Sequence, residues 1–286
     1  VFTGSIFLFS CKKEKSESPA TDTETMVSAS IDESALETTF NDLFDDAAGI
    51  DDGTAGDDLG IYGNAGAGVF ARLGETETNR TAQRCFTVSV TPRERGVFPK
   101  TVTIDFGYGC DARGHLRKGK IIMVYSGRLH VPGNSVVTTF ENYSIDSFSI
   151  QGKHTLRNVT EPGSNTKKFA TKIENAKITN QLSGRWRSWN SARLFIQTEG
   201  NGTPFFPVDD VFEVTGKASG ENSNGRSWAS EITEPLLKKF SCRWFAKGIA
   251  EIRVNSTVGK LDFGDGTCDN QATLTVNGET RAITLR

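Results

Sequence analysis

From about residue 70 onward, apolar and polar residues alternate with a period of two, the pattern of a β-strand with one buried face. Within residues 101–106, for example, Val102, Ile104 and Phe106 alternate with threonine and aspartate. Turn sequences such as Asn277-Gly278 separate many of these stretches. The predicted strands cover residues 86–91, 100–105, 120–127, 135–146, 148–158, 168–180, 185–199, 210–219, 226–233, 236–254, 259–263 and 271–285.

These strands predict the fold class. Roughly 215 residues of this kind can bury a core as one all-β domain, which we place at residues 69–286. Short turns between consecutive strands favour pairing of sequence neighbours and therefore an antiparallel meander. Such a meander either closes into a barrel or forms a strongly curved sheet, and the sequence leaves both open.

A helical pattern precedes the β region. Ser30 and Glu33 fit a capping box at the start of a helix over about residues 31–48. Its other face is acidic. Because an isolated helix of this length is marginal in water, we expect it to dock on the β domain, over an open end or a seam. The apolar residues that share one helix face are Leu36, Phe40, Leu43, Phe44 and Ala47.

The first residues predict export and lipid anchoring. Residues 1–11 are apolar and end in Leu-Phe-Ser-Cys, which resembles a bacterial lipobox whose cysteine, here Cys11, becomes acylated. The alternative is a short buried strand with an ordinary cysteine, but the polar sequence after Cys11 suits a tether better. Lys12, in place of an aspartate, favours the outer membrane, on its periplasmic or its surface face.

Residues 12–30, rich in Lys, Glu, Ser and Thr, predict a disordered tether, and residues 31–68 an acidic helix with a glycine-rich connector. The balance of charge also differs between the N-terminal segments and the rest of the chain. Residues 1–58 contain three Lys and fourteen Asp or Glu, whereas the remainder contains 30 Lys or Arg and 21 Asp or Glu. A basic body could bind an anionic partner, but we favour binding to its own acidic arm and expect no nucleic acid partner.

Four cysteines in the β region recur at matched spacings. Cys85 and Cys110 lie 25 residues apart, and Cys242 and Cys268 lie 26 apart. Each second cysteine closes a related string, IDFGYGCD or LDFGDGTCDN. We predict one disulfide within each pair, although four cysteines allow three connectivities and four separate buried thiols are the alternative.

The same spacing predicts a hairpin for each pair, because facing residues of an antiparallel hairpin lie close enough for a disulfide. If the paired cysteines face each other, the first chain reversal falls near residue 97 and the second near Asn255. Both positions lie in turn-like sequence, which is consistent with two related hairpins at the two ends of the domain.

Three strings, TVTIDFGYGCD, RKGKII and LDFGDGTCDNQATLTVNG, resemble an uncharacterised group of Gram-negative outer-membrane lipoproteins. The resemblance covers about residues 85–286. It implies an exported, lipid-anchored β protein and implies no activity and no active-site residues.

A candidate cation site lies in the second repeated string. Asp262, Asp265 and Asp269, with carbonyl groups of a glycine-rich turn, could coordinate calcium. The spacing is not that of an EF-hand, and the first copy has Tyr108 in place of Asp265. We favour the alternative, in which these carboxylates accept hydrogen bonds from backbone N–H groups of the turn.

A candidate ligand site lies where Trp186 and Trp189 stand beside Arg185 and Arg187. Two residues three apart on a strand point to opposite faces, so one tryptophan can be exposed. An exposed tryptophan next to arginine could stack on a sugar. The alternative is that both rings belong to the wall of the β structure.

No catalytic signature stands out. His115, His130 and His154 lack zinc-ligand spacing, and no G-x-S-x-G motif occurs at a strand-to-helix turn. We therefore predict a non-catalytic surface binding module without a cofactor, for a glycan or an envelope protein. The alternative is a carrier or structural envelope component that holds a lipid or a partner protein, and an enzyme of unknown class comes third.

Overall fold

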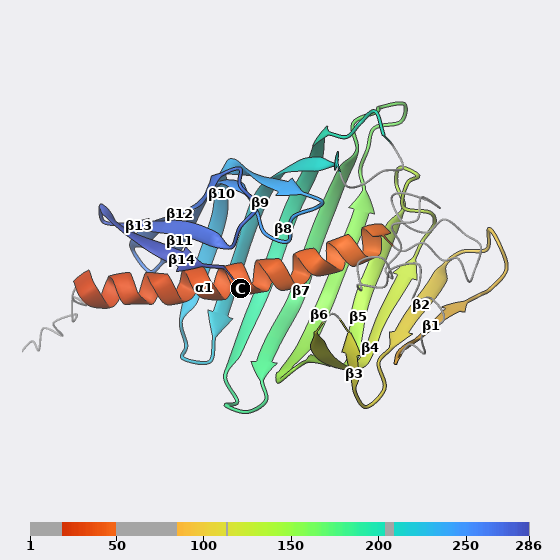
Figure 1. Ribbon diagram of the computed structural model, residues 1–286, viewed down its shortest axis with the longest axis horizontal. Helices are drawn as coiled ribbons and strands as arrows, with labels where there is room; N and C mark the ends of the chain where they lie inside the picture. The colour runs from red at the N-terminus through yellow and green to blue at the C-terminus, as the bar shows by residue number, and fades with distance from the viewer. Residues whose placement is uncertain (1–18, 50–84, 113, 204–208, 286) are drawn as a thin grey trace, which may run out of the picture.

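The computed structural model describes residues 19–49, 85–112, 114–203 and 209–285, and the helix side chains from Thr23 to Phe40 (Figure 1). One long helix lies against one large antiparallel sheet. The elements are α1 Pro19–Gly49, β1 Thr87–Thr91, β2 Lys100–Asp105, β3 Cys110–Ala112, β4 His115–Tyr125, β5 Ser135–Ile145, β6 Phe148–Asn158, β7 Lys168–Asn180, β8 Trp186–Glu199, β9 Val211–Asn222, β10 Ser227–Lys239, β11 Lys247–Val254, β12 Thr257–Asp265, β13 Gln271–Val276 and β14 Glu279–Thr284.

The sheet is a meander in chain order from β1 to β14, with the short β3 paired to β4 outside this path. The predicted antiparallel meander is therefore confirmed. The sheet stays open instead of closing into a barrel, because β1 and β14 are its two ends and do not pair with each other. Figure 1 shows β11 to β14 turned so that they run beside the N-terminal half of α1.

Every predicted strand overlaps a strand of the structure. Two predicted strands each contain a break. Residues 236–254 hold the end of β10, a turn with Cys242, and β11. Residues 271–285 form the hairpin β13–β14 around Asn277 (φ 51°) and Gly278 (φ 85°). Apolar residues continue through the first break, so alternation alone could not reveal it, whereas Asn277-Gly278 is itself a turn sequence that marks the second.

Both predicted disulfides are present. Cys85 and Cys110 have their Cα atoms 5.3 Å apart, and Cys242 and Cys268 have theirs 5.7 Å apart. Thr91 pairs with Thr101 across the first hairpin, which places its chain reversal near residue 96, one residue from the predicted position. In the second hairpin the reversal includes Asn255 (φ 53°), as predicted.

Bulges bend the strands where the pairing register shifts. One shift lies between Gln151 and Lys153 on β6, opposite β7. Gly152 occupies it with φ 126°, and a Cβ atom there would lie 2.7 Å from the Cα of Ala176. A side chain is therefore excluded by both the backbone angle and the close approach of β7.

Helix α1 docks on the sheet, as predicted, but on its face and not over an open end or a seam (Figure 1). It contacts β6 and β11 to β14, and Figure 1 shows it crossing the face of the sheet. Leu36 and Phe40 are 0% and 2% exposed. Gly259 of β12 gives room for Met26, since a Cβ atom there would lie 2.7 Å from the Met26 Cγ. The side chains of Leu43, Phe44 and Ala47 lie outside the described residues.

The helix begins at Pro19, so residues 19–30, predicted as part of a disordered tether, are helical. The predicted capping box is wrong, because Ser30 lies inside the helix and its hydroxyl donates to the carbonyl of Met26 at 2.9 Å. Burial of Met26 and Ala29 against the sheet explains the longer helix, since such packing adds to the weak stability of a helix in water. Within the described residues, no helix is long and apolar enough to cross a membrane.

Candidate functional site

Three acidic side chains of α1 point into the sheet. Asp32, Glu33 and Glu37 are only 5–7% exposed. Glu33 and Glu37 lie one helical turn apart and therefore on the same side of the helix. Leu36 and Phe40 follow Glu33 at i+3 and i+7, so one face of the helix carries both acidic and apolar side chains into the sheet.

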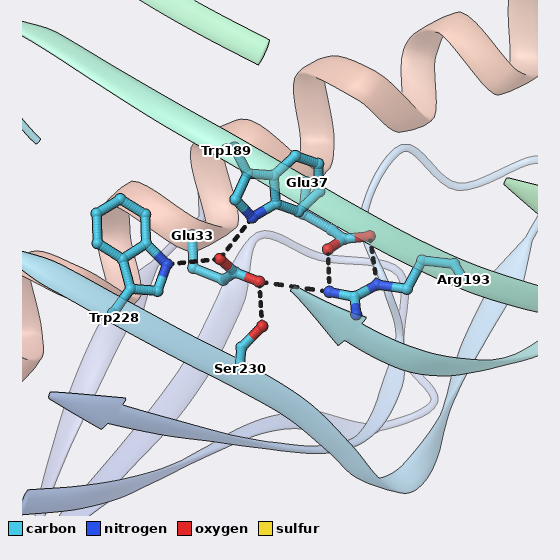
Figure 2. A network of polar contacts seen from close by, with 6 residues as sticks. All are labelled: Glu33, Glu37, Trp189, Arg193, Trp228 and Ser230. Atoms are coloured by element: carbon cyan, nitrogen blue, oxygen red, sulfur yellow. Dashed lines mark hydrogen bonds and ion pairs between the residues drawn. The ribbon is translucent and has the colours of Figure 1, made fainter. Parts of the chain in front are cut away.

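Glu33 is held by four donors from two strands (Figure 2). Its Oε2 atom accepts the indole N–H of Trp189 at 2.8 Å and that of Trp228 at 2.7 Å. Its Oε1 atom accepts hydrogen bonds from the hydroxyl of Ser230 and from Nη2 of Arg193, the latter at 3.3 Å. β8 supplies Trp189 and Arg193, and β10 supplies Trp228 and Ser230.

Glu37 forms a two-point ion pair with Arg193. The arginine donates from Nη2 to Oε2 at 2.6 Å and from Nε to Oε1 at 3.3 Å, a geometry that suits a guanidinium and a carboxylate. The Arg193 side chain is only 4% exposed. Its guanidinium carbon lies 6.0 Å from the centre of the Trp189 ring, so the indole covers part of the cation.

Asp32 extends the network toward the edge of the helix. One of its oxygens pairs with Nε of Arg187, and the other accepts a hydrogen bond from the Asn222 amide at 3.0 Å. The Arg187 side chain is 30% exposed, so this ion pair meets solvent while the Glu33 contacts do not. Three carboxylates of α1 thus face two guanidinium groups of the sheet. Together we call Arg187, Trp189, Arg193, Asn222, Trp228 and Ser230 the carboxylate cradle.

Strand geometry builds this cradle from alternate residues. Trp189 and Arg193 lie on β8 at even spacing, so they face the same side of the sheet. Trp189 and Trp228 both pair with Gly220, which lies between them on β9. A Cβ atom on Gly220 would lie 2.2 Å from Cζ2 of Trp228. The missing side chain therefore makes room for the indole that reaches Glu33.

Burial sets the electrostatics of the cradle. Loss of solvent raises the pKa of Glu33, and the nearby charge of Arg193 and the hydrogen bonds from Ser230 and Trp228 oppose this rise without cancelling it. Burial would lower the pKa of Arg193, but the charges and hydrogen bonds of Glu37 and Glu33 outweigh it and the net direction is upward. The arginine therefore stays charged, and Glu33 is the group most easily neutralised.

The four residues of the predicted ligand site do not form one surface. Trp189 is fully buried under α1, and Arg187 pairs with Asp32 on the same side. Trp186 is half-buried on the opposite side, where Nζ of Lys177 lies 4.8 Å from its ring centre. Arg185 is exposed just before β8. One tryptophan is thus covered and the other partly exposed, in line with the predicted opposite faces.

The three aspartates of the candidate calcium site each cap their own turn. Asp262 accepts from the N–H of Gly264 at 2.9 Å, Asp265 from that of Thr267 at 3.0 Å, and Asp269 from that of Gln271 at 2.8 Å. These are the backbone hydrogen bonds that the sequence favoured over calcium. Among the residues that the structure describes, no group of three His, Cys, Asp or Glu side chains is arranged to hold a metal ion.

His115 and His154 lie in different surroundings. Nδ1 of His115 lies 2.8 Å from Oδ2 of Asp146 at the surface. His154 is buried in β6, and burial lowers its pKa to about 4, so it is neutral at physiological pH. Cys11, the predicted lipidation site, lies outside the described residues.

A small pocket lies beside Glu37, between α1 and the turn before β11. The space that the centre of a water molecule can reach in it is about 10 Å³, at the lower limit for one water molecule. It is too small for an acyl chain. Its lining includes Ser34, Glu37, Thr38, Trp244, Phe263 and Leu285.

The cradle could not be found as a set from the sequence. The sequence does not single out Trp228 or Ser230, and it predicts contact between the basic body and the acidic arm without defining a pair of residues. The available signal was the even spacing of polar and aromatic residues on β8 and β10 within otherwise apolar faces.

Comparison of the chain with protein-family models, with curated proteins and with solved structures gives no match.

Proposed function

We propose that this protein is a non-catalytic binding module of the cell envelope and that the cradle-bearing face of its sheet is the binding surface. One observation carries the proposal: two strands supply four donors to a single carboxylate, that of Glu33. Such a set of donors recognises a carboxylate by geometry and charge. Helix α1 occupies this face through its own carboxylates.

The free-energy cost of burying charged side chains supports a role in recognition over a role in stability alone. Burial of ion pairs is often no better for stability than burial of apolar side chains of similar size. A helix that only had to cover the sheet would do so with leucine and alanine. The buried acids therefore favour a surface that selects what it binds.

The closed arrangement also disfavours catalysis at this site. Both oxygens of Glu33 and both oxygens of Glu37 already accept hydrogen bonds from the protein. A general acid or base needs a free position within hydrogen-bond reach of a substrate. With α1 in place, each oxygen of Glu33 accepts two hydrogen bonds, which leaves no acceptor position on this carboxylate for a reacting group.

Anchoring and location follow from the N-terminal sequence. We propose that Cys11 is lipid-modified and holds the protein at the outer membrane, on the periplasmic or the surface side. The two disulfides agree with an oxidising compartment. The resemblance to Gram-negative outer-membrane lipoproteins points in the same direction.

The second candidate is a structural component that holds a partner protein. It is favoured by the open sheet, whose end strands β1 and β14 each pair with one strand among the described residues and can accept a further strand. For carriage of a lipid, the pocket beside Glu37 in the described part of the chain is too small to hold an acyl chain. A glycan ligand at the predicted tryptophan site would rest on Trp186 and Arg185 alone.

The test is a binding screen on the full mature chain with Cys11→Ala, which keeps it in solution. Glycans, lipids and envelope proteins are offered to this chain and to the same chain with Arg193→Met. We expect at least one ligand that binds the first and is lost from the second, while Arg185→Met leaves binding unchanged. Ligands that bind both chains equally would show that the cradle is not the binding surface.

A further inference from the structure

We propose that α1 is a detachable ligand of the carboxylate cradle, and that the cradle accepts in its place an acidic amphipathic helix of a partner protein. This inference rests on the proposed binding function and names its ligand class. It is carried by the composition of the interface, by the way α1 is tied to the sheet, and by the geometry of its carboxylates.

The interface between α1 and the sheet is unusually polar for a permanent core. Between Thr23 and Phe40, seven polar or charged side chains are buried, against four apolar ones. Obligate interfaces are rich in apolar residues, whereas interfaces that form and break are more polar. The seven polar residues are Thr23, Ser30, Asp32, Glu33, Ser34, Glu37 and Thr38, and the four apolar ones are Met26, Ala29, Leu36 and Phe40.

No covalent or backbone constraint within the described residues keeps α1 on the sheet. Both disulfides lie within the β domain. The helix adds no strand pairing, because every strand of the sheet already follows the meander without it. Residues 50–84 join α1 to the first disulfide, and a chain of this length spans up to roughly 120 Å when extended. Among the described residues, detachment therefore breaks side-chain contacts only.

The contacts define what else could bind. The cradle engages two carboxylates one helical turn apart, Glu33 and Glu37, and a third at Asp32. Apolar residues flank them on both sides, with Met26 over Gly259 and Phe40 against the Trp189 ring at 5.9 Å. A helix with glutamates four residues apart and an apolar residue on either side reproduces this pattern. A sugar acid does not present its carboxylates at this spacing together with flanking apolar side chains.

The test uses the full mature chain with a protease site inserted in residues 50–84. After cleavage, a fluorescent peptide of residues 19–49 is the probe. We expect α1 to stay bound at high protein concentration and the labelled peptide to replace it over hours. The peptide with Glu33→Gln and Glu37→Gln should compete at least tenfold less well. The peptide with Glu24→Gln, a change at an exposed position, should compete as the natural one does.

Two results would overturn the inference. If the cleaved helix does not exchange over days while circular dichroism shows a folded sheet, α1 is a fixed part of the fold. The same holds if cleavage and dilution unfold the sheet. Failure of the binding function itself looks different: the peptide exchanges as expected, but the screen on the full chain finds no ligand that depends on Arg193.

Discussion

Trp189 and Trp228 donate their indole N–H groups to the same oxygen of Glu33, at 2.8 and 2.7 Å, from strands on either side of β9. Trp228 could not reach this oxygen with a side chain at residue 220, because Gly220 leaves room for its ring. The arrangement fixes the height and the rotation of α1 over the sheet. A shift of α1 by one residue would remove the carboxylate from both indoles.

Arg193 is the cation on which the cradle depends. Arg193→Met leaves Glu33 and Glu37 buried without their counter-charge, and removal of one partner of a buried ion pair costs about 3–5 kcal/mol. We expect the free energy of unfolding in urea to fall by this amount. Arg185→Met, at an exposed position, should change it by less than about 0.5 kcal/mol. Equal effects of the two changes would contradict the assigned role of Arg193.

The raised pKa of Glu33 predicts how the stability of the fold changes with pH. Burial raises its pKa in the folded protein above the ordinary value of 4.5. A group with a raised folded pKa stabilises the fold fully below its unfolded pKa, and this contribution is lost as the pH rises through the folded pKa. Relative to Glu33→Gln, the natural protein should therefore become less stable as the pH rises above about 4.5. Thermal unfolding of both proteins from pH 4 to 8 measures the difference.

Gly220 tests whether the position of the Trp228 ring matters. A Cβ atom in Gly220→Ala would lie 2.2 Å from the ring, so the indole must move away from Glu33. Overpacking of this kind costs about 1–3 kcal/mol. We expect a lower melting temperature and altered tryptophan fluorescence. Gly202→Ala is the matched control, because a Cβ atom there meets nothing within 4 Å and should leave both readouts unchanged.

A change at Cys11 tests the proposed lipid attachment. Cys11→Ala removes the predicted lipid-bearing thiol, and without the acyl chains little remains to hold the protein at a bilayer. We expect this variant in the soluble fraction after cell lysis, while Cys11 protein sediments with the outer membrane. Sedimentation of both forms would rule out the lipobox.

The sequence allowed the strands and disulfides to be predicted because both depend on local spacing. Alternation such as that from Val102 to Phe106 defines a strand without knowledge of its neighbours, and the separations of 25 and 26 residues matched the cysteines in pairs. The ends of elements were less certain. The helix extends back to Pro19 because Met26 packs on Gly259, a contact across more than 200 residues that local propensity does not contain.

The cradle could not be predicted because it depends on two long-range arrangements. Glu33 lies 156 residues from Trp189 and 195 from Trp228. Their meeting requires the pairing of β8, β9 and β10 and also the rotation of α1 about its axis. Hydrophobic periodicity assigns acids to the solvent side of a helix. That rule failed at Glu33 and Glu37, which share a helix face with the apolar stripe, because the sheet supplies donors for their charges.

Phe40 tests the apolar part of the same interface. Its side chain is 2% exposed, and its ring centre lies 6.5 Å from that of Phe140 and 5.9 Å from that of Trp189. Loss of a buried phenylalanine costs about 3–5 kcal/mol. Phe40→Asp adds a buried charge close to Glu37 and should therefore detach α1. Leu182→Asp, at a position that is 87% exposed, is the control that places the same charge on the surface.

We expect Phe40→Asp to lower the melting temperature of the soluble chain and to make α1 sensitive to proteases, while the Leu182→Asp chain resembles the natural one. High salt should destabilise the natural chain only weakly, because the buried pairs around Arg193 are screened less than surface charges. A chain truncated to begin near residue 66 lacks α1 and should melt at a lower temperature than the full soluble chain. Equal melting temperatures would mean that α1 adds nothing to the stability of the sheet. The docking contacts of Phe40 would then contribute nothing to the free energy of unfolding.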